Sequence, residues 1–301
     1  MSFAPSWRKP MVKTATDVYT GNSSLVAAVQ RTGIANLHPR SYSSIGLFAR
    51  YDGNIVGGLL LGAGMMLAGA CPGTVLAQVG VGVRSGYYAL GGAALGGIAF
   101  IRYIQPHMTS CAKQSPAPKG EIRTVHEGLG VPRSVVFLAF EAVCASVIAA
   151  TAVYTTVGPE AKISPILGGL LITSAQLISV LLRGSLIGTS TSFEEIGHWF
   201  WDLFKGDLLP KKYTNLLFVA AMSAGAYLTS KVFPALGEVS ELAVSPFSAT
   251  LGGFLMIIGA RMAGGCTSGH GLSGISLLSI SSFLSIGACF VGGGLMGLLL
   301  G

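Results

Sequence analysis

The sequence predicts an all-α integral membrane protein, a polytopic helical bundle built from two inverted repeats with re-entrant, broken helices. Three observations predict this class: the composition, the length of the apolar stretches and an internal repeat. Of the 301 residues, 51% are hydrophobic and only 10% are charged, which is too little charge for a water-soluble globular domain. The bilayer is therefore the expected solvent of this chain.

Several apolar stretches reach or approach the ~20 residues that a helix needs to cross a hydrocarbon core of about 30 Å. They cover residues 55–82, 87–104, 134–157, 166–182, 214–233, 247–265 and 275–300. They show no period-two alternation of the kind that the strands of a membrane β-barrel require. We therefore expect about seven helical elements, some of them broken.

Residues 1–53 are predicted to form a polar, basic arm. The first 50 residues contain six basic residues and a single acid, Asp17, together with many Ser and Thr residues. A cytoplasmic arm usually has this composition. An organellar transit sequence, rich in Arg and Ser and poor in acids, is the alternative.

The distribution of charge predicts which side of the membrane each loop faces. Lys and Arg collect in cytoplasmic loops, and here they cluster before residue 54, in 102–133 and in 183–212. The connections 158–164 and 236–245 carry Glu160, Glu238 and Glu241, with Lys162 as the one basic residue inside them. The N-terminus is therefore predicted to be cytoplasmic. Basic loops that flank apolar spans account for the net charge of +7 without a nucleic-acid partner.

An internal repeat appears when the chain is shifted along itself by 195 positions without gaps. Cys71 then falls on Cys266, preceded by matched Gly, Leu and Ala residues. The other matched pairs are Gly57 with Gly252, Gly58 with Gly253, Leu60 with Leu255, Gly64 with Gly259, Ala68 with Ala263, Gly69 with Gly264, Gly92 with Gly287, Ala93 with Ala288, and Gly97 with Gly292. We place the first repeat half at 54–105, a linker loop at 106–133, and the remaining transmembrane helices, including the second half, at 134–301.

The charge pattern predicts that the two copies enter the membrane from opposite sides. The first copy follows the basic arm, and the second follows the acidic connection at 236–245. Inverted repeats are a common construction of secondary transporters, in which broken helices from both halves meet near the midplane and form the substrate site.

Each copy should break at its cysteine. Pro72 lacks a backbone N–H and Gly73 tolerates unusual φ, so a helix cannot continue through Gly-Ala-Cys-Pro-Gly. Thr74, or Thr267 with Ser268, can cap a new short helix whose N-terminus directs free N–H groups at the break. Such a break favours an anion, and a soft thiol beside it suits an anion that carries sulfur.

The two segments resemble the signature of the YeeE/YedE sulfur transport family. The resemblance is strongest around Cys71, around Cys266 within Gly259–Gly274 (GARMAGGCTSGHGLSG), and in the GTSTSF run from Gly188 to Phe193. It implies an hourglass of spanning and re-entrant helices that passes thiosulfate inward, with the cysteines as weak S–H donors. It covers roughly residues 54–301. Some members place a third cysteine in the opening segment, whereas residues 1–70 contain none, so a two-cysteine pathway or an altered N-terminus is implied.

The predicted pathway residues flank both breaks. They are Gly69, Cys71, Pro72, Gly73, Thr74, Arg261, Gly264, Gly265, Cys266, Thr267, Ser268, Gly269 and His270, with Gly188, Thr189, Ser190 and Glu141 as further candidates.

Several polar residues have two interpretations. Arg261 could hold an anion or lock the loop to backbone carbonyls. Glu141, inside an apolar stretch, could serve proton coupling or pair with Arg133. The acids Glu194 and Glu195 near His198 are predicted to lie at a solvated helix end. The isolated Cys111, Cys144 and Cys289 are expected to be packing residues, and we expect no metal site and no cofactor.

The predicted function is uptake of thiosulfate or a related sulfur-containing anion, without enzymatic activity. The expected partners are that anion, the lipid bilayer and a cytosolic sulfur carrier or rhodanese-like protein. A transport role favours the plasma membrane over an organellar membrane. The alternatives are a membrane thiol-redox protein that cycles a disulfide between Cys71 and Cys266, and a membrane partner subunit that transports nothing.

Overall fold

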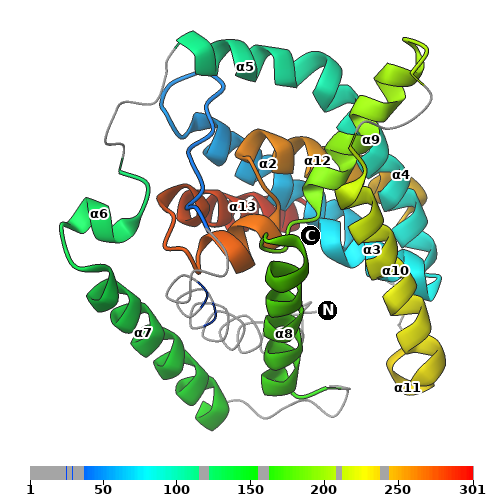
Figure 1. Ribbon diagram of the computed structural model, residues 1–301. Coiled ribbons are helices and arrows are strands. Elements are labelled where there is room, and N and C mark those ends of the chain that lie inside the picture. Colours follow the sequence, from blue (N-terminus) through cyan, green and yellow to red (C-terminus); the bar gives the residue numbers. More distant parts are fainter. Residues whose placement is uncertain are drawn as a thin grey trace. The chain divides into compact units, whose positions relative to one another are not determined.

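Figure 1 shows the computed structural model of the chain, which describes residues 25, 29, 37–114, 122–154, 163–207, 212–237 and 244–300. Within these residues every regular element is a helix, and one isolated bridge pairs Thr124 with Ser279. The predicted all-α class is confirmed. The chain divides into two compact units, one of residues 1–40, 122–187 and 272–280 and one of residues 41–121, 188–271 and 281–301.

Five helical segments in the described part of the chain are long and apolar enough to cross a membrane. They are Asp52–Val81, Arg133–Ala150, Ile166–Arg183, Pro246–Ala263 and Ile280–Leu299. The stretches 87–104 and 214–233, which were also expected to span, are helical but are not among these five. The stretch expected at 275–300 becomes helical at Ile280, after a run of turns.

The second unit holds most of the helices. They are α2 (Asp52–Ala68), α3 (Pro72–Val81), α4 (Arg84–Ala99), η1 (Phe100–Ile104), α5 (Gln105–Gln114), α9 (Ser190–Leu203), α10 (Thr214–Val232), α11 (Pro234–Gly237), α12 (Pro246–Ala263) and most of α13 (Ile280–Leu299). Its core combines fully buried side chains of α2 and α12, among them Leu61 and Met256, with Cys266. Small residues dominate this core, as is usual where membrane helices approach closely.

Helices α2 and α12 cross with their backbones in contact at glycines. A methyl group on Gly57 would lie 2.6 Å from the carbonyl oxygen of Gly259, and one on Gly64 would lie 2.7 Å from that of Gly252. The residue number rises along α2 as it falls along α12, so the two helices run in opposite directions. The two contacts also exchange under the 195-residue shift, because Gly57 corresponds to Gly252 and Gly64 to Gly259.

A second pair of contacts is also related by the 195-residue shift. A methyl group on Gly58 of α2 would lie 2.5 Å from the carbonyl oxygen of Ser285 on α13, whereas Gly253 of α12 abuts the Ala89 carbonyl of α4. Gly58 corresponds to Gly253 in the repeat, and α4 corresponds to α13. The first helices of the two copies, α2 and α12, therefore pack on each other. Each also packs on the later helix of the other copy, α2 on α13 and α12 on α4.

The last residues of the predicted arm are folded onto this core. Asp52 accepts hydrogen bonds from the backbone N–H groups of Ile45 (2.8 Å) and Leu47 (2.6 Å). The side chain of Asn54 accepts one from the Ser43 N–H (2.7 Å) and donates one to the Ala263 carbonyl (2.9 Å). Residues 1–24, which make up much of the predicted arm, lie outside the described residues.

The described residues of the predicted linker loop at 106–133 include two helices. Most of α5 lies within it, and so does the five-residue α6 (Val125–Leu129). Glu127 accepts hydrogen bonds from the N–H groups of Arg123 (2.8 Å) and Thr124 (3.0 Å) and so caps α6. These bonds, with the Arg123 bond the strongest cause, lower the pKa of Glu127.

The first unit contains α6, α7 (Arg133–Tyr154) and α8 (Pro165–Arg183). The amide of the fully buried Gln176 on α8 donates to the Ser273 hydroxyl (3.1 Å) and accepts from the Ile187 N–H (3.1 Å). The Ser273 hydroxyl in turn donates to the Ile187 carbonyl (2.9 Å). This polar group inside an apolar helix is therefore satisfied by its own unit.

Candidate functional site

The first break is present at the predicted place. Helix α2 ends at Ala68, Gly69 adopts φ +64°, and Cys71 is extended before Pro72 begins α3. Cys71 itself is the cap, which corrects the expectation that Thr74 takes this role. The Cys71 N–H donates to Thr74 Oγ1 (2.6 Å), and the Thr74 N–H donates to Cys71 Sγ (3.4 Å). This reciprocal pair is a capping box in which a thiol is one acceptor.

The second break has the same start and a different continuation. Helix α12 ends at Ala263, and Gly264 adopts φ +84°. The following element is the π-helix η2 (Thr267–Gly274), which replaces the expected short helix capped by Thr267 and Ser268. The Ser268 hydroxyl lies 3.0 Å from Cys266 Sγ instead.

Thr189 lies between the two breaks. Its Oγ1 is 3.5 Å from Cys266 Sγ. A methyl group on Gly73 would lie 3.9 Å from both Thr189 Cγ2 and Thr189 Oγ1, and 3.8 Å from Cys71 Sγ. Residues 188–190 precede or begin α9, and Thr189 and Ser190 are both buried. The structure thus brings together the three segments of the resemblance.

The two thiols differ in their exposure. Cys266 is fully buried, whereas Cys71 is half-buried. All five cysteines are free thiols. In the part of the chain that the structure describes, no three His, Cys, Asp or Glu side chains gather as a metal site would require.

His270 fastens η2 to the end of α12. Its Nε2 lies 2.9 Å from the Ala263 carbonyl, and its Nδ1 lies 2.9 Å from the Ser282 hydroxyl. A carbonyl oxygen only accepts, so Nε2 carries a proton and donates to it. With both ring nitrogens bound and the side chain buried, His270 holds the geometry of the second break.

Arg261, in the last turn of α12, forms an ion pair with Glu194 of α9. It also lies 3.5 Å from Thr191 Oγ1 and packs over the ring of Phe100. We expected Arg261 either to hold an anion or to bond to backbone carbonyls. Its partner is instead the carboxylate of Glu194. The pairing joins the helix before the second break to the helix that follows Thr189.

Glu194 and Glu195 do not lie at a solvated helix end, contrary to the expectation. The Glu194 side chain is 18% exposed, and Glu195 is 8% exposed. Glu195 accepts hydrogen bonds from the N–H groups of Asn215 (3.1 Å) and Leu216 (3.0 Å), so it caps the start of α10. The sequence did not reveal these roles because the partners are distant along the chain.

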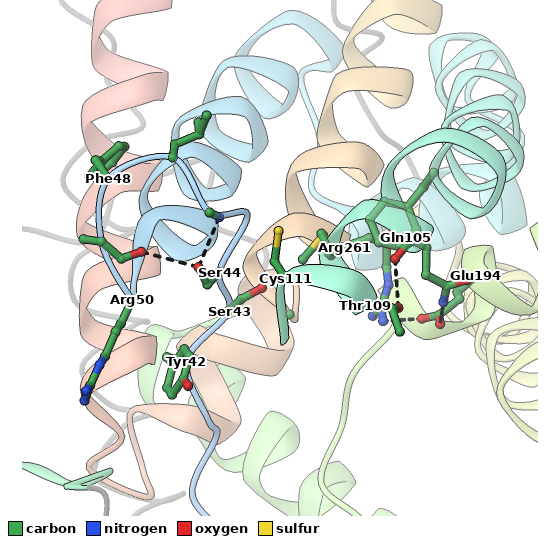
Figure 2. A pocket seen from close by; sticks show the side chains of 16 residues that line it. Tyr42, Ser43, Ser44, Phe48, Arg50, Gln105, Thr109, Cys111, Glu194 and Arg261 are labelled. Carbon is green, nitrogen blue, oxygen red and sulfur yellow. Dashed lines mark hydrogen bonds and ion pairs between the residues drawn. The ribbon is translucent and has the colours of Figure 1, made fainter. Parts of the chain in front are cut away.

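A pocket of ≈ 730 Å³ opens beside the second break (Figure 2). Arg261, Glu194, Gln105 and Gly264 line it, and Tyr42–Arg50 and α5 supply most of the remaining wall. Cys111 also lines it, with its Sγ 3.7 Å from Nε2 of His107, one turn earlier. No pattern in the sequence indicates this pocket, because its walls come from four separate segments.

Glu141, the remaining candidate, lies half-buried on α7 in the first unit.

Comparison with known proteins identifies the family. The thiosulfate transporter TsuA of Spirochaeta thermophila is 26% identical over 269 residues, which cover 87% of this chain and 79% of that protein. Two probable transporters from strains of Xylella fastidiosa are 31% and 30% identical over 129 residues, 43% of this chain and 87% of each of them. Residues 8–295 match the family described as Sulphur transport, a longer match than the resemblance from residue 54. The chain therefore belongs to the YeeE/YedE sulphur transport family of membrane proteins.

Proposed function

We propose that this protein takes up thiosulfate or a closely related sulfur-containing anion along a path past Cys71, Thr189 and Cys266. The observation that carries the proposal is the meeting of both cysteine breaks at Thr189. Two chain interruptions that converge in this way supply backbone dipoles and soft thiols at one place. The name of the relative from Spirochaeta thermophila supports thiosulfate as the substrate.

We propose that the two copies are inverted repeats and that the chain re-enters the membrane after each break. The opposite directions of α2 and α12, and the exchange of their glycine contacts under the 195-residue shift, support this arrangement. Irregular backbone at membrane depth is tolerated where protein covers it or where it lines a wet path. The breaks at Gly69–Cys71 and Gly264–Cys266 are the places where that path would run.

The anion would pass by hydrogen bonding, with no covalent step. Cys71 is half-buried and would meet the anion first, and the buried Cys266 would receive it beyond Thr189. The small residues Gly73 and Gly265 leave room beside the thiols, while Pro72 and the hydroxyl-bearing Thr74, Thr267 and Ser268 shape the turns. Gly269 lies within η2 after the second break, and Gly188 precedes Thr189 before the start of α9.

We further propose a plasma-membrane location with a cytoplasmic N-terminus, and delivery to a cytosolic sulfur carrier or rhodanese-like protein. The basic loops motivate the sidedness. The function is transport, and no catalytic residues are proposed.

The test is uptake of labelled thiosulfate by sulfur-starved cells that lack their own importer. Cells with the unmodified chain, Cys71→Ala, Cys266→Ala and the control Cys144→Ala are compared at matched membrane expression. Cys144 is a buried thiol on α7, so its variant controls for loss of one sulfur atom. Uptake should fall to background in both break variants and persist in the control.

Three results would contradict the proposal. Uptake that persists in both break variants would leave the thiols outside the path. No uptake with the unmodified chain would favour a partner subunit that transports nothing. A reversible disulfide between Cys71 and Cys266, detected by thiol labelling in oxidising and reducing buffer, would instead favour the redox alternative.

A further inference from the structure

The Arg261–Glu194 ion pair lines the pocket of Figure 2 close to the second break. Gly264, two residues before Cys266, lines the same pocket. Both charged side chains are largely enclosed, at 15% exposed for Arg261 and 18% for Glu194. A positive group is therefore held beside the end of the proposed path, with a carboxylate already bound to it.

The guanidinium of Arg261 is only partly used by its neighbours. Its terminal nitrogens reach Glu194 and Thr191, but its buried Nε has no hydrogen-bond partner among the described residues. The ring of Phe100 lies 6.0 Å from the guanidinium carbon and holds the plane in place. A planar fork with a spare donor is suited to an oxyanion, which can accept two parallel N–H bonds.

The carboxylate of Glu194 has other partners that would keep it in place if Arg261 moved to another anion. The amide of Gln105 donates to Glu194 Oε1 (2.9 Å), and Nε2 of His198 lies 3.9 Å from the same oxygen. Figure 2 shows Gln105, Glu194 and Arg261 converging at one end of the pocket. Glu194 therefore has an alternative to its ion pair.

We propose that Glu194 is a resident counter-anion that occupies Arg261 until a divalent oxyanion displaces it, so that this pair forms a gated anion site in the pocket. The substrate identity, thiosulfate, rests on the proposed function; the anion site itself does not, because sulfate offers the same oxygens. A dianion competes with the single charge of the carboxylate for the guanidinium. The carboxylate then also repels the bound anion, which promotes its release.

Anion binding to the purified full-length chain in detergent tests this proposal. Equilibrium dialysis with labelled sulfate and labelled thiosulfate is carried out on the unmodified chain, Glu194→Gln and Arg261→Gln. Glu194→Gln should tighten sulfate binding by about tenfold, because Arg261 is no longer occupied by a carboxylate and is free to bind sulfate. Arg261→Gln should abolish sulfate binding at this site.

Charge-matched controls isolate the site from the net charge. Asp202→Asn and Lys205→Gln make the same charge changes at another ion pair, in which the Asp202 side chain is 19% exposed, similar to the 18% of Glu194, and the Lys205 side chain is 72% exposed. Neither should change sulfate affinity. Equal tightening in Asp202→Asn and Glu194→Gln, or unchanged binding in Arg261→Gln, would overturn the proposal and leave the pair a structural brace between α9 and α12.

A milder variant covers the case in which Glu194→Gln does not fold. Glu194→Asp withdraws the carboxylate by one methylene and should tighten sulfate binding by a smaller factor; unchanged or weaker binding contradicts the proposal. Sulfate binding is also measured in the double variant that combines Cys71→Ala with Cys266→Ala. Sulfate binding that survives there supports an arginine site separate from the thiols, whatever the uptake result, and loss of binding there refutes it.

Discussion

The two breaks are alike up to the cysteine and differ after it. In both, a glycine at positive φ ends the helix two residues before the thiol. The repeat then aligns Pro72 with Thr267, Gly73 with Ser268, Thr74 with Gly269 and Val75 with His270. The first break continues as an α-helix with a half-buried thiol, and the second continues as a π-helix with an enclosed one.

This difference shows which residues set the break and which set the environment of the thiol. The glycine before each cysteine releases the chain from the helix, so both copies turn at the same place. The residues that follow each cysteine, together with Thr189 at the second break, decide what contacts the sulfur. At the first break, a backbone N–H donates to Cys71 Sγ; at the second, the hydroxyls of Ser268 and Thr189 surround Cys266 Sγ. We infer that the first thiol admits the anion and the second receives it.

The strongest test of the likeness between the copies is to separate α2 from α12. Gly64→Ala and Gly259→Ala are equivalent in the repeat, and each places a methyl group against the backbone of the opposite helix. Each should lower the free energy of unfolding by about 3 kcal/mol, because the helices must move apart. Thermal unfolding of the purified protein in detergent measures this loss.

Gly91→Ala is the matched control, since a methyl group there meets nothing within 4 Å. Its stability should equal or slightly exceed that of the unmodified chain, because Ala favours a helix. A large loss in only one of the two repeat variants would show that the copies do not pack symmetrically.

Much of this fold could be predicted from local sequence. The apolar stretches gave the helices, and the Gly and Pro residues around Cys71 gave the first break, because both signals act within a few residues. The second break was predicted in place, but its π-helix was not. That geometry depends on His270, whose partners Ala263 and Ser282 lie seven and 12 residues away.

The site could be predicted only in part, for the same reason. The resemblance indicated Thr189, but no pattern in the residues themselves placed it beside Cys266, 77 residues later. Glu194 was assigned to a solvated helix end because Trp199 and basic residues follow it in sequence. Its true partner, Arg261, is on another helix, and such tertiary pairing leaves no local periodicity.

Replacing His270 with its counterpart tests whether the second break depends on hydrogen bonds. His270→Val installs the residue found at position 75 of the first copy. It should lower the free energy of unfolding by about 2 kcal/mol, because the buried Ser282 hydroxyl loses its imidazole partner. His198→Ala, at an imidazole that is 52% exposed, is the control and should change little. Equal stability of His270→Val and the unmodified chain would mean that packing volume alone maintains the second break.

The smallest expected effect concerns the capping box at the first break. Thr74→Ala removes the oxygen that accepts the Cys71 N–H and should cost about 1 kcal/mol of stability, as loss of a helix cap usually does. Thr74→Ser keeps that oxygen and should retain most of the stability of the unmodified chain. The Thr74 N–H still donates to Cys71 Sγ in both variants. Labelling of Cys71 by a maleimide, measured in a chain whose other four cysteines are replaced by Ala, should therefore stay within about twofold. A much faster reaction in Thr74→Ala than in Thr74→Ser would show that the hydroxyl, and not the helix backbone, governs access to the first thiol.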